Sequence, residues 1–102
     1  MTKNQSLRGQ LVDETTFISL GDLCHSCTVK TEEVIIMVEE GILDPQVGQA
    51  EPAAVATWLF HISSVKRVRT AVHLQRDLGI NLPGAALALD LLDQIAELKK
   101  AL

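Results

Sequence analysis

The apolar residues in the first half of this 102-residue chain recur with helical spacing in two short stretches. Over residues 19–27 they fall at i, i+3, i+4 and i+7, which places Leu20, Leu23, Cys24 and Cys27 on one helical face. Ser19 is typical of an N-cap for this helix. A second helix is expected from Thr31, as its N-cap, to Glu40, with Gly41 ending it. The intervening residues 28–30 make the pair a helix-turn-helix unit.

Two further segments have strand-like or loop-like composition. Residues 11–18, LVDETTFI, predict a short strand, and residues 57–60, TWLF, predict a second strand or the edge of a wing. Residues 45–56 contain Pro, Gly and small side chains and are expected to form a loop. We expect Trp58 and Phe60 to plug the core between the wing and the third helix.

The second half of the chain predicts two longer helices. One runs from Ser63 to Leu78 and is capped by Gly79, and the other runs over about 82–101, opened by Asn81 and Pro83. The last helix has two apolar stripes. One, expected to cover the core of the domain, comprises Leu82, Ala85, Leu89, Leu92 and Ala96. The other has the spacing of a coiled-coil seam and comprises Gly84, Ala88, Leu91, Ile95, Leu98 and Leu102.

This second stripe predicts a homodimer through Ala88, Leu91, Ile95, Leu98 and Leu102. A single wide buried face is the alternative interpretation, because the seam spans only about 2.5 heptads.

Length and composition indicate one mainly α domain, with residues 11–60 as the helix-turn-helix and wing and residues 62–102 as the third and fourth helices. The apolar content of 47% with 22% charged residues is ordinary for a globular protein. Neither a signal-peptide h-region nor a run of 18 apolar residues is visible, so we expect a cytoplasmic protein with reduced thiols and no membrane partner.

The net charge of −4 is unevenly distributed. Residues 31–60 contain six acidic residues and no Lys or Arg. Four basic residues follow in the third helix, namely Lys66, Arg67, Arg69 and Arg76. We expect these bases to form ion pairs within the chain or with a dimer mate rather than to contact nucleic acid. The acidic middle indicates a basic partner and disfavours a phosphate backbone.

Helical geometry separates the second helix into two faces. Val34, Met37 and Val38 share the face expected to meet the core. The opposite face carries Glu32, Glu33, Ile36, Glu39 and Glu40, so that Ile36 stands among carboxylates. An apolar anchor with a charged rim suits a modest protein interface, and these five residues with Asp44 are the predicted partner-binding set. The alternative is an ordinary solvated helix face with one scattered apolar residue.

The segment LCHSCTVKTEEVIIMVEEGILDP resembles the N-terminal half of MerR-type regulators, and TWLF, AVHLQRDLGI, LPGAALAL and LLDQIAELK resemble the CbpM family of chaperone modulators. The resemblance implies a MerR-like, winged-helix-type domain that binds the J-domain of a DnaJ-like co-chaperone of the CbpA type. By masking the surface that the J-domain shows to its Hsp70, such a protein would inhibit the co-chaperone, without catalysis.

The chain departs from the MerR pattern in the second helix. Glu32 and Ile35 stand where the arginines of a MerR-type recognition helix would be, and Ile36-Met37 replaces its tyrosine pair. Thr28 replaces the turn Gly, and Lys30 replaces the N-cap Ser. No nucleic acid partner is therefore expected, although a MerR-type DNA-binding transcriptional regulator remains the alternative function.

Other candidate chemistry is sparse. Cys24 and Cys27 have C-x-x-C spacing with His25 between them, but a zinc site needs further ligands, so we expect both thiols to pack in the core. Asp90 and Asp93 form a carboxylate pair, which we interpret as a solvated helix face. The sequence contains no G-x-S-x-G motif or phosphate-binding loop, and we expect no catalytic residue, metal or cofactor.

Overall fold

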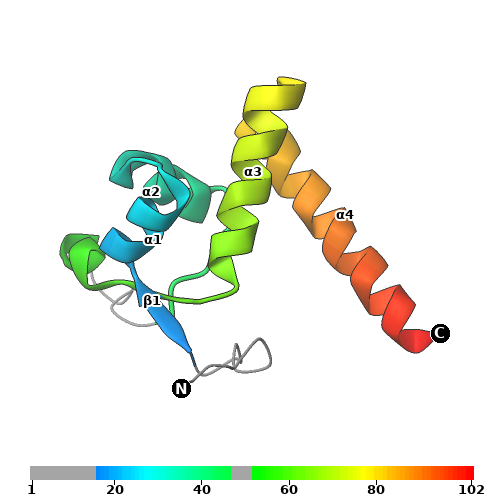
Figure 1. The fold of residues 1–102 in the computed structure, drawn as a ribbon, viewed down its shortest axis with the longest axis horizontal. Coiled ribbons are helices and arrows are strands. Elements are labelled where there is room, and N and C mark those ends of the chain that lie inside the picture. The colour runs from blue at the N-terminus through cyan, green and yellow to red at the C-terminus, as the bar shows by residue number, and fades with distance from the viewer. Residues whose placement is uncertain (1–15, 47–51) are drawn as a thin grey trace, which may run out of the picture.

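The computed structural model describes residues 16–46 and 52–102, and its fold is mainly α. A two-stranded antiparallel sheet joins β1 (Phe17–Ser19) to β2 (Leu59–His61), with Ile18 opposite Phe60 (Figure 1). Of the strand predicted over 11–18, residues 11–15 lie outside the described residues. The strand predicted over 57–60 is shifted toward the C-terminus.

The predicted loop over 45–56 is wrong for its last part. Residues Pro52–Thr57 form a 3-10 helix, η2, which takes up the start of the expected strand. Pro52 suits the first position of this turn, because its fixed φ is compatible with a helix and its missing N–H has no partner there. Residues 47–51 lie outside the described part of the chain.

Local capping determines where the first two helices begin and end. Helix α1 (Leu20–Cys27) starts as predicted, with the Ser19 hydroxyl accepting the Asp22 N–H at 3.1 Å. Helix α2 (Thr31–Glu39) has Lys30, not Thr31, at its N-cap. The prediction was off by one residue because the Glu33 carboxylate accepts the Lys30 N–H at 2.9 Å, so the side chain of a later residue satisfies this end.

Residues with a left-handed backbone conformation end three of the helices. Thr28 follows α1 with a φ of 55°, and Gly41 follows α2 with a φ of 82°. Gly79, with a φ of 67°, ends α3 (Ser64–Leu78). The two glycines are where the sequence predicted helix stops, whereas Thr28 holds a conformation that is costly for a β-branched side chain.

A tight junction connects α3 to α4 (Leu82–Ala101). The Asn81 side chain accepts the Gly84 N–H at 2.8 Å, which confirms the predicted start of α4. A Cβ at Gly84 would lie 2.8 Å from Cγ2 of Ile80, so the glycine allows the junction to close. The two long helices are therefore closest near this junction.

One buried cluster holds α1, α2, β2 and α3 together. Its largest fully buried side chains are Phe60, Leu23, Met37, Ile42, Val34 and Val68. Trp58 packs edge-to-face on Phe60 with the ring centroids 6.2 Å apart, in line with the expected core plug. Helix α3 runs through the middle of the molecule, with α1 and α2 on one side of it (Figure 1).

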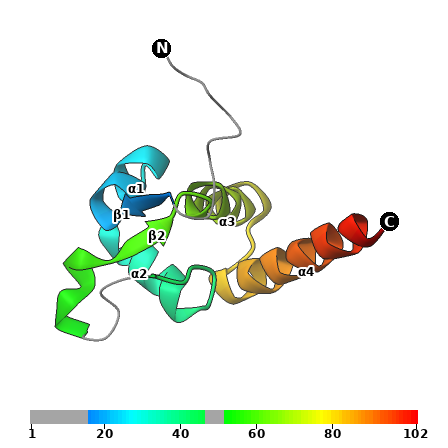
Figure 2. The ribbon, with the colours of Figure 1, turned by 90° about the horizontal axis from the view of Figure 1, so that it is seen from below.

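Helix α4 leaves this core about halfway along its length. Ala85 and Leu89 are buried, but Leu92 is 48% exposed and Ala96 is exposed as well. The prediction that the stripe from Leu82 to Ala96 covers the core is therefore wrong for its C-terminal part. The cause is the angle between the helices: α4 diverges from α3, and its C-terminal end projects away from the rest of the chain (Figures 1 and 2).

Arg67 bridges the elements that meet where α4 diverges. Its Nε donates to the Ile42 carbonyl at 2.8 Å, in the segment that follows α2. Its Nη1 lies 3.0 and 2.9 Å from the two carboxylate oxygens of Asp93 on α4. One guanidinium thus connects α3 both to the end of the helix-turn-helix unit and to α4.

Replacing this bridge should destabilise the fold measurably. Arg67→Ala removes a charge-assisted hydrogen bond and an ion pair, and we expect the free energy of unfolding to fall by about 1–2 kcal/mol in urea denaturation. Arg76→Ala is the control, because Arg76 lies exposed on the same helix, and it should change the value by less than about 0.5 kcal/mol. Equal effects of the two substitutions would contradict the bridge.

The strained turn offers an independent test. Thr28→Gly should raise the free energy of unfolding by about 1 kcal/mol, since glycine adopts a positive φ without the Cβ clash. Gly41→Ala, which places a Cβ on a similar conformation, should lower it by about the same amount. Thermal and urea unfolding of the two variants beside the wild type would measure both changes, and a destabilising Thr28→Gly would disprove the strain.

Candidate functional site

The outward face of α2 carries the predicted partner-binding side chains. Glu32, Glu39 and Glu40 are exposed, and Ile36 between them is 43% exposed. On the opposite side Val34 and Met37 are fully buried, because these residues complete the core beneath the helix. The fold therefore displays an aliphatic side chain surrounded by carboxylates, which we call the acidic face of α2 (Glu32, Glu33, Ile36, Glu39 and Glu40).

Two members of the predicted partner-binding set, Glu33 and Asp44, differ from the others. Glu33 is half-buried, and its carboxylate already accepts the Lys30 N–H, so it has both a structural contact and a place on the rim. Asp44 lies in the segment after α2 and lines a hollow together with Arg67 and Asp93. Asp44 is exposed, but the structure groups it with α3 and α4 more than with the carboxylates around Ile36.

No basic side chain neutralises the acidic face from within the described part of the chain. The ion pairs found there join Arg67 to Asp93, His73 to Asp77 and Lys100 to Glu97. The α2 carboxylates thus remain available to an external cation, although each exposed pair that they form contributes only a few tenths to about 1 kcal/mol. Several such pairs around one desolvated Ile36 make a usable interface.

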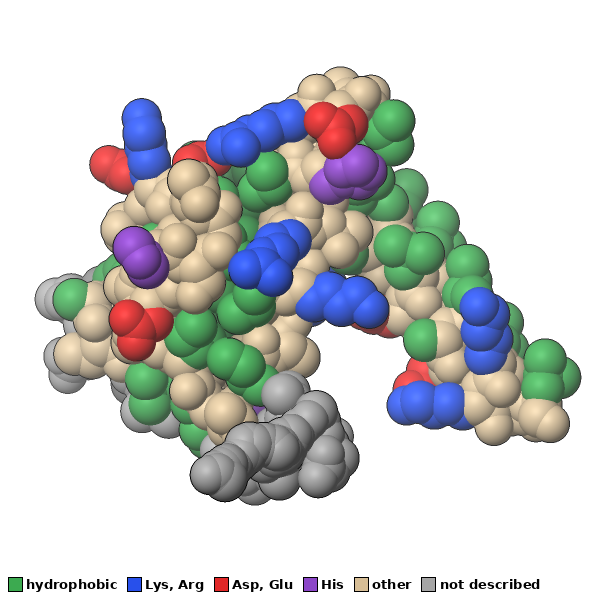
Figure 3. Space-filling model, viewed as in Figure 1, with side chains coloured by type: hydrophobic (Ala, Val, Ile, Leu, Met, Phe, Trp, Pro, Cys, Tyr) green, Lys and Arg blue, Asp and Glu red, His purple; other side chains and the backbone are tan. Residues whose placement is uncertain are grey.

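A second exposed surface follows the outer side of α4. The predicted dimer residues Leu91, Ile95, Leu98 and Leu102 are 49%, 47%, 67% and 105% exposed, and Ala88 is half-buried. Green side chains line the free edge of this helix in Figure 3. A contiguous apolar strip of this kind indicates a contact surface, whereas scattered apolar residues would not.

Leu87 belongs to this strip, although the heptad pattern did not predict it. Leu87 is 62% exposed, and it precedes Leu91 by four residues, so both lie on the same side of α4. The heptad pattern started from Gly84 and Ala88 and therefore passed over it. A helical wheel without a fixed heptad would have found it, since the apolar arc of α4 is wider than one coiled-coil seam.

The two cysteines serve the packing of α1. Both are half-buried against the core, and the Cys27 thiol contacts the Val65 carbonyl oxygen at 3.6 Å. Burial raises the pKa of Cys27, with the Arg69 charge opposing the rise, so the thiol form is favoured. Among residues 16–46 and 52–102 no three His, Cys, Asp or Glu side chains are grouped so that they could hold a metal ion.

The basic residues of α3 have different surroundings. Arg67 forms the intramolecular ion pair that was expected, and Arg69 donates to the Ser26 carbonyl at 3.2 Å. Lys66 and Arg76 have no hydrogen-bond or ion-pair partner within the described residues. The interpretation of Asp90 and Asp93 as a merely solvated pair is wrong for Asp93, because α4 diverges at an angle that brings its carboxylate to Arg67.

Searches against known proteins identify similar sequences. The family model for MerR helix-turn-helix regulatory proteins matches residues 18–102. The chain is 34% identical over 102 residues to a "Chaperone modulatory protein CbpM" of Coxiella burnetii (strain Dugway 5J108-111), covering all of this chain and 91% of that protein. It is 30% identical over 90 residues to the protein of the same name in Escherichia coli O139:H28 (strain E24377A / ETEC), covering 88% of this chain and 84% of that protein.

Proposed function

Because this chain belongs to the CbpM family of chaperone modulatory proteins and has a MerR-type helix-turn-helix fold, we propose that it inhibits a DnaJ-like co-chaperone by binding its J-domain through the acidic face of α2. A role as chaperone modulator follows from the family. The choice of the J-domain as the target rests on the resemblance to the CbpM family, and the choice of α2 as the contact rests on charge and exposure.

The observation that carries the proposal is the group of unneutralised carboxylates around Ile36. A J-domain presents a basic helix to its Hsp70 partner, and an acidic face is its electrostatic complement. Glu32, Glu39 and Glu40 would meet its basic side chains while Ile36 loses water at the centre of the contact. Both proteins would then compete for one helix, and inhibition would be steric.

The same surface disfavours the alternative of a MerR-type DNA-binding regulator. In a helix-turn-helix protein the second helix enters the major groove and approaches phosphates on both sides. Here that helix is α2, which has no Lys or Arg and three Glu, with Glu40 directly after it. Strong retardation of duplex DNA with a steep salt dependence would favour DNA binding over the proposed function.

We further propose that the chain works as a homodimer in the cytoplasm, the compartment of a DnaJ-like partner. The support for the dimer is the apolar strip on α4, formed by Leu87, Ala88, Leu91, Ile95, Leu98 and Leu102. Joining two such strips would remove from water leucine side chains that the monomer leaves exposed. No helix of the described chain is long and apolar enough to cross a membrane.

Reversing charges on the acidic face should abolish most J-domain binding. Glu39→Lys with Glu40→Lys replaces attraction by repulsion at the proposed contact, and we expect Kd to rise by about 10- to 100-fold in calorimetry. The matched control is Asp90→Lys with Glu97→Lys, which makes the same charge change on the polar side of α4 and should leave Kd within about twofold.

Circular dichroism would show that both charge variants are folded. Wild-type binding should also weaken as salt is added, mainly through a slower association rate. Equal binding by the acidic-face variant and the wild type would exclude α2 as the contact. A loss of binding in both variants would point to net charge instead of a defined surface.

The dimer is tested separately. Leu91→Glu with Leu98→Glu places two carboxylates in the apolar strip, and sedimentation should show a change from twice the chain mass to the chain mass. Gln94→Glu with Lys100→Gln changes the net charge equally on the polar side of α4 and should leave the dimer intact. A monomeric wild type at about 100 µM, a concentration at which a dimer of Kd about 1 µM would persist, would refute the dimer.

A further inference from the structure

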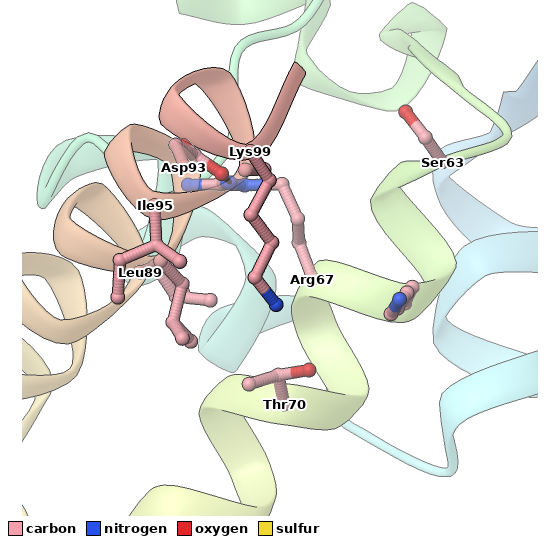
Figure 4. A pocket seen from close by; sticks show the side chains of 10 residues that line it. Ser63, Arg67, Thr70, Leu89, Asp93, Ile95 and Lys99 are labelled. Atoms are coloured by element: carbon pink, nitrogen blue, oxygen red, sulfur yellow. Dashed lines mark hydrogen bonds and ion pairs between the residues drawn. The ribbon is translucent and has the colours of Figure 1, made fainter. Parts of the chain in front are cut away.

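An open groove lies between α3 and α4 where the two helices diverge. It is lined on α3 by Lys66, Arg67 and Thr70, with Ser63 just before the helix, and on α4 by Leu89, Leu92, Asp93, Ile95, Ala96 and Lys99. Figure 4 shows these side chains, and Figure 3 shows the notch between the helices. Its volume is about 620 Å³, which is enough to accept several side chains.

The two walls of the groove differ in chemistry. The α4 wall is aliphatic, with Leu92 and Ile95 each about half exposed. The α3 wall is polar, with the Lys66 ammonium and the Thr70 hydroxyl. A segment that fills the groove must therefore be amphipathic, with an apolar side toward α4 and a polar side toward α3.

The charge expected on the polar side of that segment follows from the basic side chains that line the groove. Arg67 is paired with Asp93 at the back of the groove and contributes little net charge. Neither the Lys66 ammonium on α3 nor the Lys99 ammonium on α4 is among the ion pairs formed within the described residues. Two free ammonium groups on opposite walls attract carboxylates and repel a basic segment such as the helix proposed above to meet α2.

The groove differs from both surfaces already described, although Ile95 of the α4 strip also lines it. At about 100° per residue, the side of α4 that carries Leu89, Leu92 and Ala96 lies roughly 140° around the helix from the strip centred on Leu91 and Leu98, with Ile95 between the two. The acidic face of α2 belongs to another helix altogether. Occupation of the groove is therefore compatible with a bound J-domain, whereas a dimer through the strip would share Ile95 with the occupant of the groove.

We propose that this groove binds an acidic amphipathic helix of a partner protein. Leucine-like side chains of that helix would pack on Leu92, Ile95 and Ala96, where they remove half-exposed aliphatic surface from water. Its carboxylates would pair with Lys66 and Lys99 from the two sides. The chain then has two docking sites of opposite charge, one for a basic helix and one for an acidic helix.

The test uses a fluorescein-labelled synthetic peptide of about 16 residues, long enough for some helix, with Leu at i, i+3, i+4 and i+7 and Glu at most other positions. Fluorescence polarisation with the full chain should give a Kd on the order of 10 µM. Lys66→Glu with Lys99→Glu should weaken it at least about tenfold. Arg76→Glu with Lys100→Glu makes the same charge change outside the groove and should stay within about twofold.

The apolar wall has its own pair of variants. Leu92→Ser should weaken the peptide about fivefold, and Leu87→Ser, at an exposed position outside the groove, should not. The Glu39→Lys, Glu40→Lys variant should bind the peptide as well as the wild type does, so a failed J-domain proposal leaves this result unaffected. A peptide with Gln in place of Glu should lose its affinity.

Three outcomes would overturn the proposal. The first is no binding up to about 1 mM peptide, which corresponds to less than about 4 kcal/mol of affinity. The second is equal weakening by the groove pair and its charge-matched control. The third is dissociation of a dimer in step with peptide binding, measured by sedimentation, because a second copy of this chain would then be the natural occupant of the groove.

Discussion

The contacts of Arg67 set the arrangement on which the other surfaces depend. Its guanidinium holds the segment after α2 through the Ile42 carbonyl and holds α4 through Asp93. The tight junction at Gly84 brings α3 and α4 together at one end, and the Arg67–Asp93 pair fixes their separation farther along. Beyond this pair every residue of α4 is exposed in the described part of the chain. The exposed apolar strip and the α3–α4 groove both result from that divergence.

Compared with DNA-binding helix-turn-helix proteins, the helix-turn-helix unit of this chain keeps a buried apolar face on its second helix but has a different outer surface. Val34 and Met37 hold α2 in the core, so the outward residues of α2 are free of any structural requirement to be basic. Glutamates there leave the fold intact but reverse the sign of the electrostatic potential at the position that reads DNA in related folds. Membership of the CbpM family agrees with such a change of partner, from a polyanion to a protein.

Local signals in the sequence predicted most helix boundaries. Ser19, Asn81, Gly41 and Gly79 act through hydrogen bonds or dihedral angles within a few residues, and each was found where its pattern indicated. Thr31 was the wrong N-cap because the carboxylate of Glu33 reaches back to Lys30. The Lys-Thr-Glu-Glu stretch fits a helix start with either Lys30 or Thr31 at the N-cap, and only the folded backbone distinguishes the two.

The sequence predicts which residues share one face of a helix, but not which other elements that face contacts. Periodicity placed Ile36 and the carboxylates of α2 on one side and separated the two stripes of α4. It did not show that the burial of α4 ends near Leu89, because the crossing angle of two helices depends on tertiary contacts such as the Arg67–Asp93 pair. The sequence therefore did not predict the groove, although it contains Lys66, Leu92 and Lys99.

The projecting half of α4 has a consequence for the backbone itself. Every residue of α4 after Asp93 is exposed in the described part of the chain, and a helix end of about two turns without tertiary packing is marginal in water, so in the isolated chain the amides there have little protection from solvent. If the proposed dimer or the proposed partner helix covers this end, its hydrogen exchange will slow when either one binds. The order of the last two turns would then report locally how much of the protein is bound.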